Sequence, residues 1–326
     1  MNTVHALEAV MKSVGILGAG ATGRLVADLL VKRGHHVTLV SRSGRFPRGG
    51  YESAVADVRD SAQLSRVLSG SAQGAGGCDI VVNAVNPASY TAWQRDWPPM
   101  AEGIAEACRQ LGAGLVTVGN LYAYGRVNTP MTEDQPVAAN GAKGTVRAAM
   151  WEQALEQHRS GATPAVEVRA SDYFGATAGP GVSLLMDYVL RPVAQGKTAW
   201  VPVGSLDAAH SWTYLPDIAR LVADLVDSDQ AGRRWGRVWH VPTAEARSMR
   251  EVSDDVARLA EREPARIRRV PSPIMAAARV HPLVRALDET RHQFELPWIV
   301  DSTAAQSEFG WGPTNWQCAL RETLAD

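Results

Sequence analysis

Short apolar runs alternate with stretches of helical periodicity through the first half of this 326-residue chain. Each run has the length and composition of a buried strand, and each intervening stretch places its apolar residues on one helical face. The predicted strands occupy residues 14–17, 36–40, 53–56, 80–82, 115–118 and 166–169, and the predicted helices 25–33, 60–68, 99–111 and 143–158. This alternation predicts an α/β fold with a doubly wound parallel sheet.

The second half of the chain is less regular and contains no internal repeat. Predicted helices cover residues 183–190, 217–226 and 248–259, and predicted strands cover 199–203, 238–241 and 266–270. We therefore predict a smaller mixed α/β C-terminal domain formed by residues 176–206 and 246–326. Residues 11–175 form the larger domain, residues 207–245 return to it, and residues 1–10 are an N-terminal extension.

A glycine-rich turn joins the first predicted strand to the first predicted helix. Gly18, Gly20 and Gly23 form the pattern G-x-G-x-x-G at that junction. In a Rossmann-type domain the first glycine permits a tight turn, the second lets a pyrophosphate approach, and the third lets the helix pack closely. The helix N-terminus, with Ala21 and Thr22, presents free N–H groups to phosphates. The motif predicts a dinucleotide bound by these five residues.

The residues after the second predicted strand indicate which dinucleotide binds. An NAD-type site has an acidic residue about 20 positions beyond the last motif glycine, where it accepts hydrogen bonds from the adenosine ribose. This chain has Ser41 and Arg42 there, with Arg45 and Arg48 close behind. A guanidinium fits a 2′-phosphate, so we predict NADP(H) as the cofactor, bound in part by Ser41 and Arg42. A solvated basic loop is the alternative.

Composition and charge narrow the classes of partner. The chain carries 33 basic and 34 acidic residues, a net charge of −1, which gives no electrostatic case for nucleic-acid binding. We find no apolar run of membrane-spanning length and no signal peptide pattern. The three cysteines have no metal-ligand spacing. We therefore expect a cytoplasmic protein without a metal, acting on a small-molecule substrate as a monomer or homodimer.

Several segments together resemble the extended short-chain dehydrogenase/reductase family, also called the NAD-dependent epimerase/dehydratase family. These segments are residues 18–23, 57–58, 120–125, 169–175, 213–217 and 301–313. The resemblance implies a cofactor-binding Rossmann-type domain and a smaller C-terminal domain that closes over a substrate. It also implies that Asp57 and Val58 contact the adenine and that Ala84, Asn86 and Pro87 line the cofactor.

The chain departs from that family where the chemistry is concentrated. Members carry a Ser or Thr after the fifth strand, where this chain has Asn120, and a Tyr-x-x-x-Lys pair on the next helix. No tyrosine lies between Tyr124 and Tyr173, and the nearest equivalent of the pair is Lys143 with Arg147. An arginine keeps its charge and cannot donate a proton, so another group must replace the missing tyrosine.

Tyr122 is our main candidate for the acid/base group. It follows the fifth predicted strand, so it lies at the carboxyl edge of the sheet, where the nicotinamide is expected. Lys143 would support it as a neighbouring cation, or would itself donate the proton if buried beside Arg147. Tyr124 is a further candidate, although the family's Tyr-Gly pair mainly shapes the turn. Asn120 either hydrogen-bonds a substrate carbonyl or braces the loop.

Aromatic and histidine side chains supply the candidate substrate contacts. The chain contains ten tryptophans, whose flat indole face and single N–H suit ring-shaped ligands. Packing in the core and between domains is the alternative explanation for each residue. The predicted substrate-binding residues are Trp93, Trp97, Tyr173, His210, Trp212 and His292.

These observations favour an NADP(H)-dependent oxidoreductase that acts on a carbonyl or alcohol of a small cyclic or aromatic metabolite. The dinucleotide would carry the hydride, and the protein would position the substrate and supply the proton. Two alternatives stay open: an epimerase, dehydratase or cyclase without net redox change, and a catalytically inactive redox sensor that binds NADP(H). The missing Tyr-x-x-x-Lys pair favours the sensor, whereas the second domain and the aromatic residues favour an enzyme.

Overall fold

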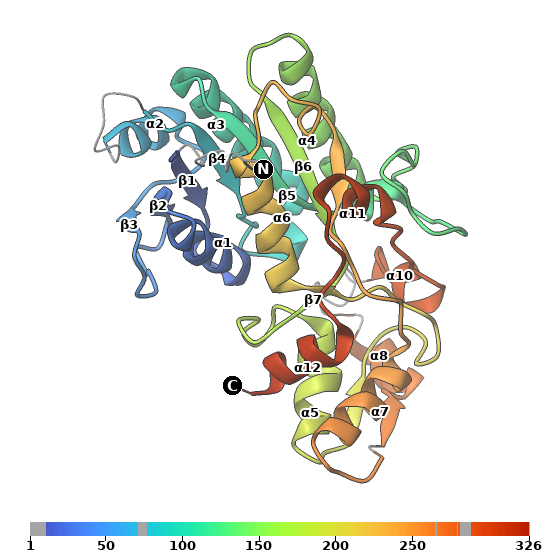
Figure 1. Cartoon of the computed structure of the whole chain (residues 1–326). Coiled ribbons are helices and arrows are strands. Elements are labelled where there is room, and N and C mark those ends of the chain that lie inside the picture. The colour runs from blue at the N-terminus through green and yellow to red at the C-terminus, as the bar shows by residue number, and fades with distance from the viewer. Residues whose placement is uncertain (1–10, 71–76, 265, 279, 281–287, 326) are drawn as a thin grey trace, which may run out of the picture.

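Seven parallel strands form the central sheet of the protein (Figure 1). The computed structural model describes residues 11–70, 77–264, 266–278, 280 and 288–325, so the predicted extension over residues 1–10 lies outside the described residues. The strands follow the order β10-β6-β5-β4-β1-β2-β3, which reverses between β1 and β4 and confirms the predicted doubly wound α/β fold. Their bounds are β1 Ser13–Leu17, β2 His36–Val40, β3 Glu52–Ala54, β4 Ile80–Asn83, β5 Gly114–Asn120, β6 Ala165–Ala170 and β10 Val238–His240.

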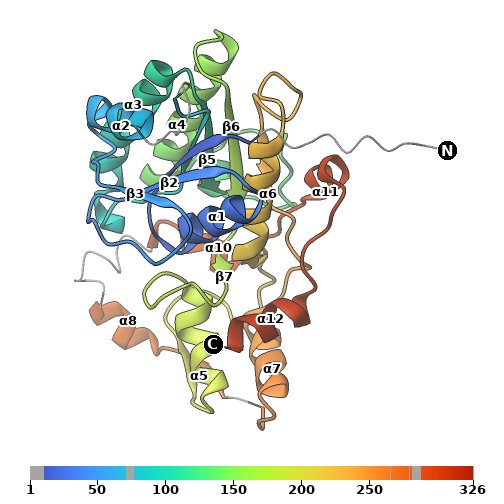
Figure 2. The same ribbon diagram turned by 60° about the vertical axis from the view of Figure 1, so that its left-hand side comes forward.

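Helices cover both faces of this sheet (Figures 1 and 2). Helix α1 packs against α6 on one face, while α2, α3 and α4 lie side by side on the other. Residues of β1 alternate between the two layers, because Val14 and Ile16 join the core under α1 and α6, and Leu17 joins the core under α2 and α3. The helices are α1 Ala21–Lys32, α2 Ser61–Gly70, α3 Trp93–Leu111, α4 Ala142–Arg159 and α6 Leu215–Asp227.

Helix α3 begins six residues before the start predicted at Pro99, since its first residue is Trp93. Pro98 and Pro99 lie inside it, and each proline removes one helical hydrogen bond. Trp93 and Trp97 lie one turn apart and are both buried. Burying two indole rings offsets the lost hydrogen bonds, so the helix extends through both prolines.

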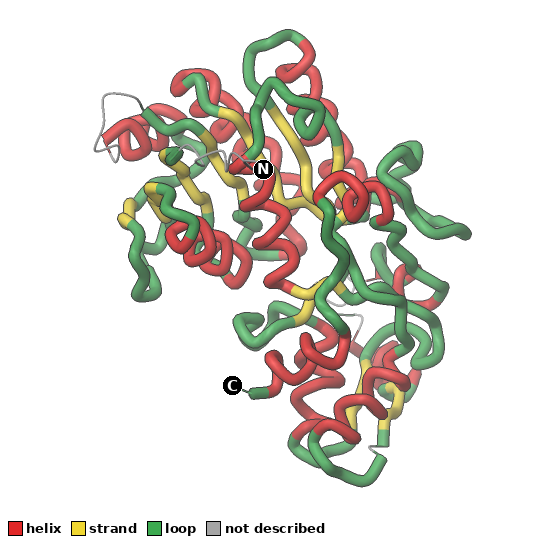
Figure 3. The backbone as a smooth tube through the Cα atoms, viewed as in Figure 1, coloured by secondary structure: helices red, strands yellow, loops and turns green. Residues whose placement is uncertain are grey.

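The C-terminal half of the chain contributes to both parts of the molecule. Strand β10 pairs with β6 at the edge of the sheet, and α6 packs on α1, so the chain returns to the first domain after leaving it. Most of the remaining elements form a smaller group of helices with a two-stranded sheet, β8 with β11 (Figure 3). A second short sheet pairs β7 with β9, and α11 lies beside β10. No helix within the described ranges is both long and apolar enough to cross a membrane. The elements not yet given are β7 Tyr173–Phe174, α5 Arg191–Ala194, β8 Ala199–Val201, β9 Thr213–Tyr214, α7 Met249–Leu259, β11 Ile267–Arg269, α8 Ser272–Ala278, α10 His292–Glu295, α11 Thr303–Phe309 and α12 Trp316–Leu324.

Two local structures in this half show how sequence patterns translate into geometry. The helix predicted over residues 183–190 is a π-helical turn at Met186–Leu190 that continues into α5. Helix α7, predicted over residues 248–259, begins with a capping box, in which the Ser248 hydroxyl accepts from the backbone N–H of Glu251 and the Glu251 carboxylate accepts from the backbone N–H of Ser248. This capping box fixes the start of α7 at the position where the helix was predicted to begin.

A buried histidine ties the last strand of the sheet to the rest of the protein. His240 is fully buried, its Nε2 lies 2.8 Å from the Tyr124 hydroxyl, and its Nδ1 lies 2.9 Å from the carbonyl oxygen of Asp301. Burial lowers the pKa of His240 from 6.5 to about 4. The imidazole is therefore neutral in the folded protein, with Nδ1–H donating and Nε2 accepting.

We expect this histidine to make the fold sensitive to acid. Its pKa is lower in the folded protein than in the unfolded chain, so protonation favours unfolding. The contribution of neutral His240 to the free energy of unfolding is fully present above pH 6.5 and is lost as the pH falls towards 4. The loss is about 3 kcal/mol in the free energy of unfolding. Urea unfolding of the parent and of His240→Gln at neutral and acidic pH measures it. Equal pH dependence in the two proteins would contradict the assignment.

Candidate functional site

The turn between β1 and α1 places three glycines at the carboxyl edge of the sheet. Gly18 has a φ of 103°, which other residues rarely adopt. A Cβ on Gly23 would overlap the carbonyl oxygen of Gly18, so this glycine is required for the close packing of α1. A Cβ on Gly20 would meet no protein atom within 4 Å. The space in front of Gly20, at the N-terminus of α1, is therefore open to a dinucleotide phosphate.

A cavity of about 630 Å³ begins at this turn and runs along the carboxyl ends of β1, β4, β5 and β6. Residues 181–184 of the C-terminal half contribute to its wall. A cavity of this size accommodates a drug-sized ligand. The sequence-predicted residues that line it are Gly18, Gly20, Ala21, Thr22, Ala84, Asn86, Pro87, Trp93, Asn120, Tyr122 and Tyr173.

A second cavity, of about 130 Å³, shares part of its wall with the first. Asp57 lies here and forms an ion pair with Arg59, which holds the pKa of the Asp57 carboxyl below its ordinary value. A carboxylate and the exposed guanidinium of Arg42 therefore border the same space. This cavity brings together four residues that sequence analysis assigned to the adenosine half of the cofactor, namely Ser41, Arg42, Asp57 and Val58.

Two tyrosine hydroxyls meet in the large cavity. Tyr122 follows β5 and Tyr90 precedes α3, and the Tyr90 hydroxyl donates a hydrogen bond of 2.7 Å to that of Tyr122. Burial raises the pKa of Tyr122 well above its ordinary value and that of Tyr90 to about 12, so both phenols are protonated at neutral pH. Because Tyr122 accepts from Tyr90, its own O–H can donate to a cavity occupant. The Asn120 side chain braces this turn by accepting from the backbone N–H of Tyr122 at 3.1 Å.

A buried guanidinium stands beside the tyrosine pair. Arg147 lies 4.3 Å from the ring centre of Trp97 and 5.0 Å from that of Trp93, and its Nη2 donates to the side-chain oxygen of Asn86 at 3.1 Å. Burial lowers the pKa of Arg147 to about 10, which leaves it charged at neutral pH. Its charge partly offsets the rise in the pKa of Tyr122, so it favours the phenolate that proton donation would leave.

Lys143 contacts the tyrosine pair from the opposite end. Its Nζ lies 2.8 Å from a carboxylate oxygen of Glu289 and 4.6 Å from the ring centre of Tyr90. It is buried and is not among the residues that line the large cavity. Lys143 thus contacts the pair at Tyr90, whereas the charge of Arg147 opposes the rise in the pKa of Tyr122.

Four of the predicted substrate residues lie behind the wall of the large cavity. Trp97 packs on the buried guanidinium, Trp212 donates its indole N–H to a backbone carbonyl, and His292 contacts two backbone carbonyls. His210 connects to the cavity through Asp172, whose carboxylate lies 3.0 Å from the imidazole Nε2. The structure thus separates residues of the cavity wall, such as Trp93 and Tyr173, from residues that pack behind it.

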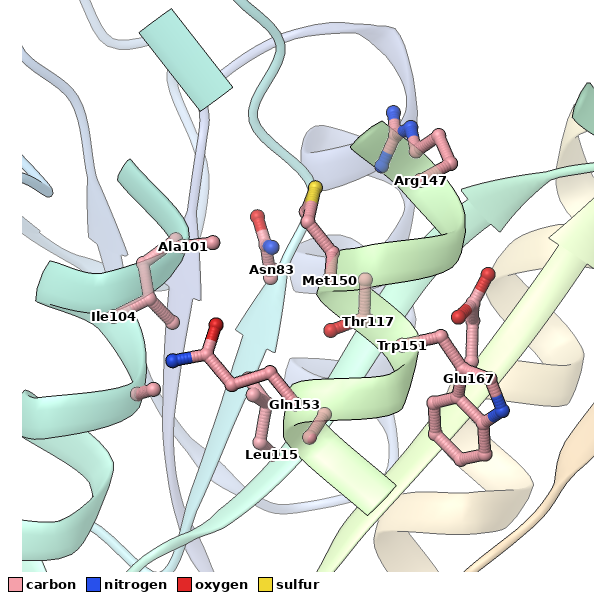
Figure 4. Close-up of a pocket in the computed structure, with 12 residues that line it drawn as sticks. Asn83, Ala101, Ile104, Leu115, Thr117, Arg147, Met150, Trp151, Gln153 and Glu167 are labelled. Atoms are coloured by element: carbon pink, nitrogen blue, oxygen red, sulfur yellow. The ribbon is translucent and has the colours of Figure 1, made fainter. Parts of the chain in front are cut away.

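A third cavity lies between α3, α4 and the strands beneath them (Figure 4). Its volume is about 20 Å³, which suits a single water molecule and excludes any metabolite. Asn83, Thr117 and Glu167 supply polar groups to it, and Arg147 borders both this cavity and the large one (Figure 4). This cavity is therefore a small gap in the packing around Arg147 and not a substrate site.

Sequence reasoning missed several residues of this site, among them Tyr90, Asp172 and Glu289. Tyr90 lies three positions beyond Pro87, just after the segment expected to line the cofactor, and that position was a usable signal. Asp172 follows the end of β6, also at the carboxyl edge of the sheet. Glu289 pairs with a residue 146 positions away, and no local pattern identifies it. Within the described part of the chain, no group of three or more His, Cys, Asp or Glu side chains could hold a metal ion.

A protein-family model and a known reductase both match most of this chain. Residues 14–239 match the model of the NAD dependent epimerase/dehydratase family. A dTDP-4-dehydrorhamnose reductase of Streptomyces griseus is 27% identical over 286 residues, covering 84% of each chain.

Solved structures show the same fold. UDP-glucose 4-epimerase of Thermus thermophilus, in complex with NAD, matches with a TM-score of 0.75 and 19% identity over 96% of this chain and 97% of that one. dTDP-glucose 4,6-dehydratase of Bacillus anthracis str. Ames, also in complex with NAD, matches with a TM-score of 0.75 and 16% identity over 96% and 95% of the two chains. Both matches cover the C-terminal half as well as the nucleotide-binding sheet.

Proposed function

The chain belongs to the NAD-dependent epimerase/dehydratase family, and from that premise we propose an NADP(H)-dependent oxidoreductase acting on a carbonyl or alcohol of a small cyclic or aromatic metabolite. The observation that carries the proposal is the continuous cavity from the Gly20 turn to the Tyr122 hydroxyl. One end fits the phosphates of a dinucleotide, and the other presents a phenol that can donate a proton. The aromatic rings of Tyr90, Trp93 and Tyr173 give that end a wall suited to a ring-shaped substrate.

Residues of this chain carry out the steps other than hydride transfer, namely proton donation and stabilisation of the resulting charge. A nicotinamide dinucleotide supplies the hydride when bound. Tyr122 donates its proton to the substrate oxygen as that oxygen gains negative charge, which is general acid catalysis. Tyr90 then stabilises the phenolate with its hydrogen bond, and Arg147 stabilises it with its buried charge. Asn120 keeps Tyr122 in position through its backbone.

A direct assay tests this function. The protein is mixed with NADPH and a set of cyclic ketones, including dTDP-4-dehydrorhamnose, which the name of the Streptomyces griseus relative indicates. Loss of NADPH absorbance together with formation of an alcohol supports the oxidoreductase. Binding of NADPH without turnover of any member of the set would favour the sensor.

A reaction without net redox change is the second candidate, because the two structural neighbours are an epimerase and a dehydratase by name. In that case the same cavity would convert a substrate with no change in NADPH absorbance. Product analysis by mass spectrometry and NMR separates the two functions, since a dehydratase removes water and an epimerase preserves mass.

The cofactor preference gives a separate prediction. We expect tighter binding of NADPH than of NADH, because Arg42 can pair with a 2′-phosphate in the smaller cavity. Such a contact is worth about 1.5–3 kcal/mol, roughly ten- to a hundredfold in affinity. Arg42→Asp should remove or reverse the preference in calorimetric titrations. Arg45→Asp is the matched control, since Arg45 is exposed on the same loop and does not line the cavity. Equal affinities in the parent protein would contradict the prediction.

A further inference from the structure

The imidazole of His210 is held rigidly beside the large cavity. Its ring lies 4.1 Å from the ring centre of Trp212 and 5.0 Å from that of Phe294, and the Phe294 ring is parallel to it within 3°. Backbone hydrogen bonds to Arg247 hold the segment in place. The side chain is almost fully buried, with 3% exposed. These contacts fix which atom each ring nitrogen faces.

Both ring nitrogens of His210 face hydrogen-bond acceptors. Nδ1 lies 3.0 Å from the backbone carbonyl oxygen of Gln293, and Nε2 lies 3.0 Å from Oδ2 of Asp172. A carbonyl oxygen cannot donate, so Nδ1 must carry a hydrogen. The contact at Nε2 then needs a second hydrogen, either on Nε2 or on the carboxyl group. A neutral histidine and an ionised aspartate together hold one proton too few for this arrangement.

A second histidine–aspartate pair, His35 with Asp227, has a different hydrogen-bond partner at Nδ1. His35 Nε2 lies 2.7 Å from Oδ1 of Asp227, but its Nδ1 accepts a hydrogen bond from the backbone N–H of Lys12 at 3.2 Å. One hydrogen on Nε2 therefore satisfies both contacts of His35. Asp227 also pairs with Arg33, but the group that faces Nδ1 is an N–H donor at His35 and a carbonyl acceptor at His210, and this difference decides how many hydrogens each ring needs.

We propose that Asp172 and His210 form a unit that holds one transferable proton and gives the large cavity a second acid/base group, separate from Tyr122. Asp172 is the exposed member, because 26% of its side chain is accessible and it lines the cavity, whereas His210 lies behind it. The flanking aromatic faces of Trp212 and Phe294 stabilise an imidazolium. The catalytic part of this inference rests on the proposed function, and the proton count does not.

The proton transfer conserves atoms and charge. The unit breaks one N–H or O–H bond, and a new O–H bond forms on an oxygen of the substrate. A neutral imidazole with its hydrogen on Nδ1 remains, facing an ionised carboxylate. The lone pairs of Nε2 and Oδ2 then face each other at 3.0 Å, and this repulsion draws a proton back from solvent.

Nuclear magnetic resonance of the full chain, labelled with ¹⁵N histidine, tests the proton count near neutral pH. We expect two bound hydrogens on the His210 ring, or one on Nδ1 together with a protonated Asp172 carboxyl. The His35 ring serves as the internal control and should carry a single hydrogen on Nε2. In Asp172→Asn the amide N–H₂ can donate to Nε2, so His210 should become neutral with its hydrogen on Nδ1. A parent His210 ring with its only hydrogen on Nε2, beside an ionised Asp172, would overturn the proposal.

Kinetics of the same variant test the catalytic part. Asp172→Asn preserves a hydrogen bond to His210 but cannot exchange a proton, so we expect turnover of any ketone that the parent reduces to fall by about 10²–10⁴-fold. NADPH affinity should stay within a few-fold. Parent-like turnover in Asp172→Asn would refute the catalytic role even if the proton count holds. If the parent reduces no ketone, the proposed function fails, and the spectra still decide the proton count.

Discussion

Replacing Tyr122 with Phe should lower turnover by about 10²–10⁴-fold, the usual cost of losing a general acid. The substitution removes one hydroxyl from the cavity wall and leaves the ring, which packs 5.8 Å from Trp93, in place. The phosphate-binding turn lies at the other end of the cavity, so NADPH affinity should change by no more than a few-fold. Steady-state rates and calorimetric titrations measure the two quantities separately.

Tyr124→Phe is the matched control for this experiment. Tyr124 lies in the same short turn, but its hydroxyl is buried against His240 and does not line the cavity. We expect this variant to lose stability while its turnover per folded molecule stays close to that of the parent. A Tyr122→Phe protein with the parent's rate would exclude Tyr122 as the acid, and Asp172 would then be the next candidate on the cavity wall.

Replacing Gly20 with Val should abolish dinucleotide binding in a protein that still folds. No protein atom lies within 4 Å of a Cβ built at this position, so the fold tolerates a side chain there. The same space is where a pyrophosphate must approach the backbone at the N-terminus of α1. Thermal unfolding should match that of the parent, while fluorescence titration with NADPH should show no saturation.

Gly23→Ala, on the same turn, should lower the stability of the fold, in contrast to Gly20→Val. A Cβ here collides with the carbonyl oxygen of Gly18, so we expect a lower melting temperature even though the residue adds only one methyl group. If Gly20→Val binds NADPH with the affinity of the parent, the phosphates bind elsewhere in the cavity.

Local pattern predicts the sheet because each strand and helix carries its own signal. The strand predicted over residues 53–56 shows the limit, since β3 ends at Ala54. Val55 lies beyond it with 53% of its surface exposed, at the edge of the sheet, where a hydrophobic residue need not continue the pairing. The glycine motif also predicts the tight turn between β1 and α1, because its geometry depends on spacing along the chain alone.

The contacts of the residues that we propose as proton donors could not be predicted in the same way. Tyr90 meets Tyr122 across 32 positions, and Asp172 meets His210 across 38. Each contact results from how α3, β5 and the C-terminal half pack together. No local sequence pattern around Tyr90 identifies Tyr122 as its partner. Sequence analysis could name Tyr122 and His210 as candidates but could not supply the residues that give them a chemical role.

The packing of α1 against α6 has a consequence for biosynthesis. A ribosome completes the glycine turn and α1 long before it reaches residue 215, where α6 begins. During that interval the part of α1 that packs on α6 has no partner, and the sheet lacks β10 at its edge. We therefore expect the nascent first half to expose apolar surface that chaperones can bind until α6 and β10 have been synthesised. A fragment ending at residue 175 keeps that exposed face permanently and should aggregate when expressed alone.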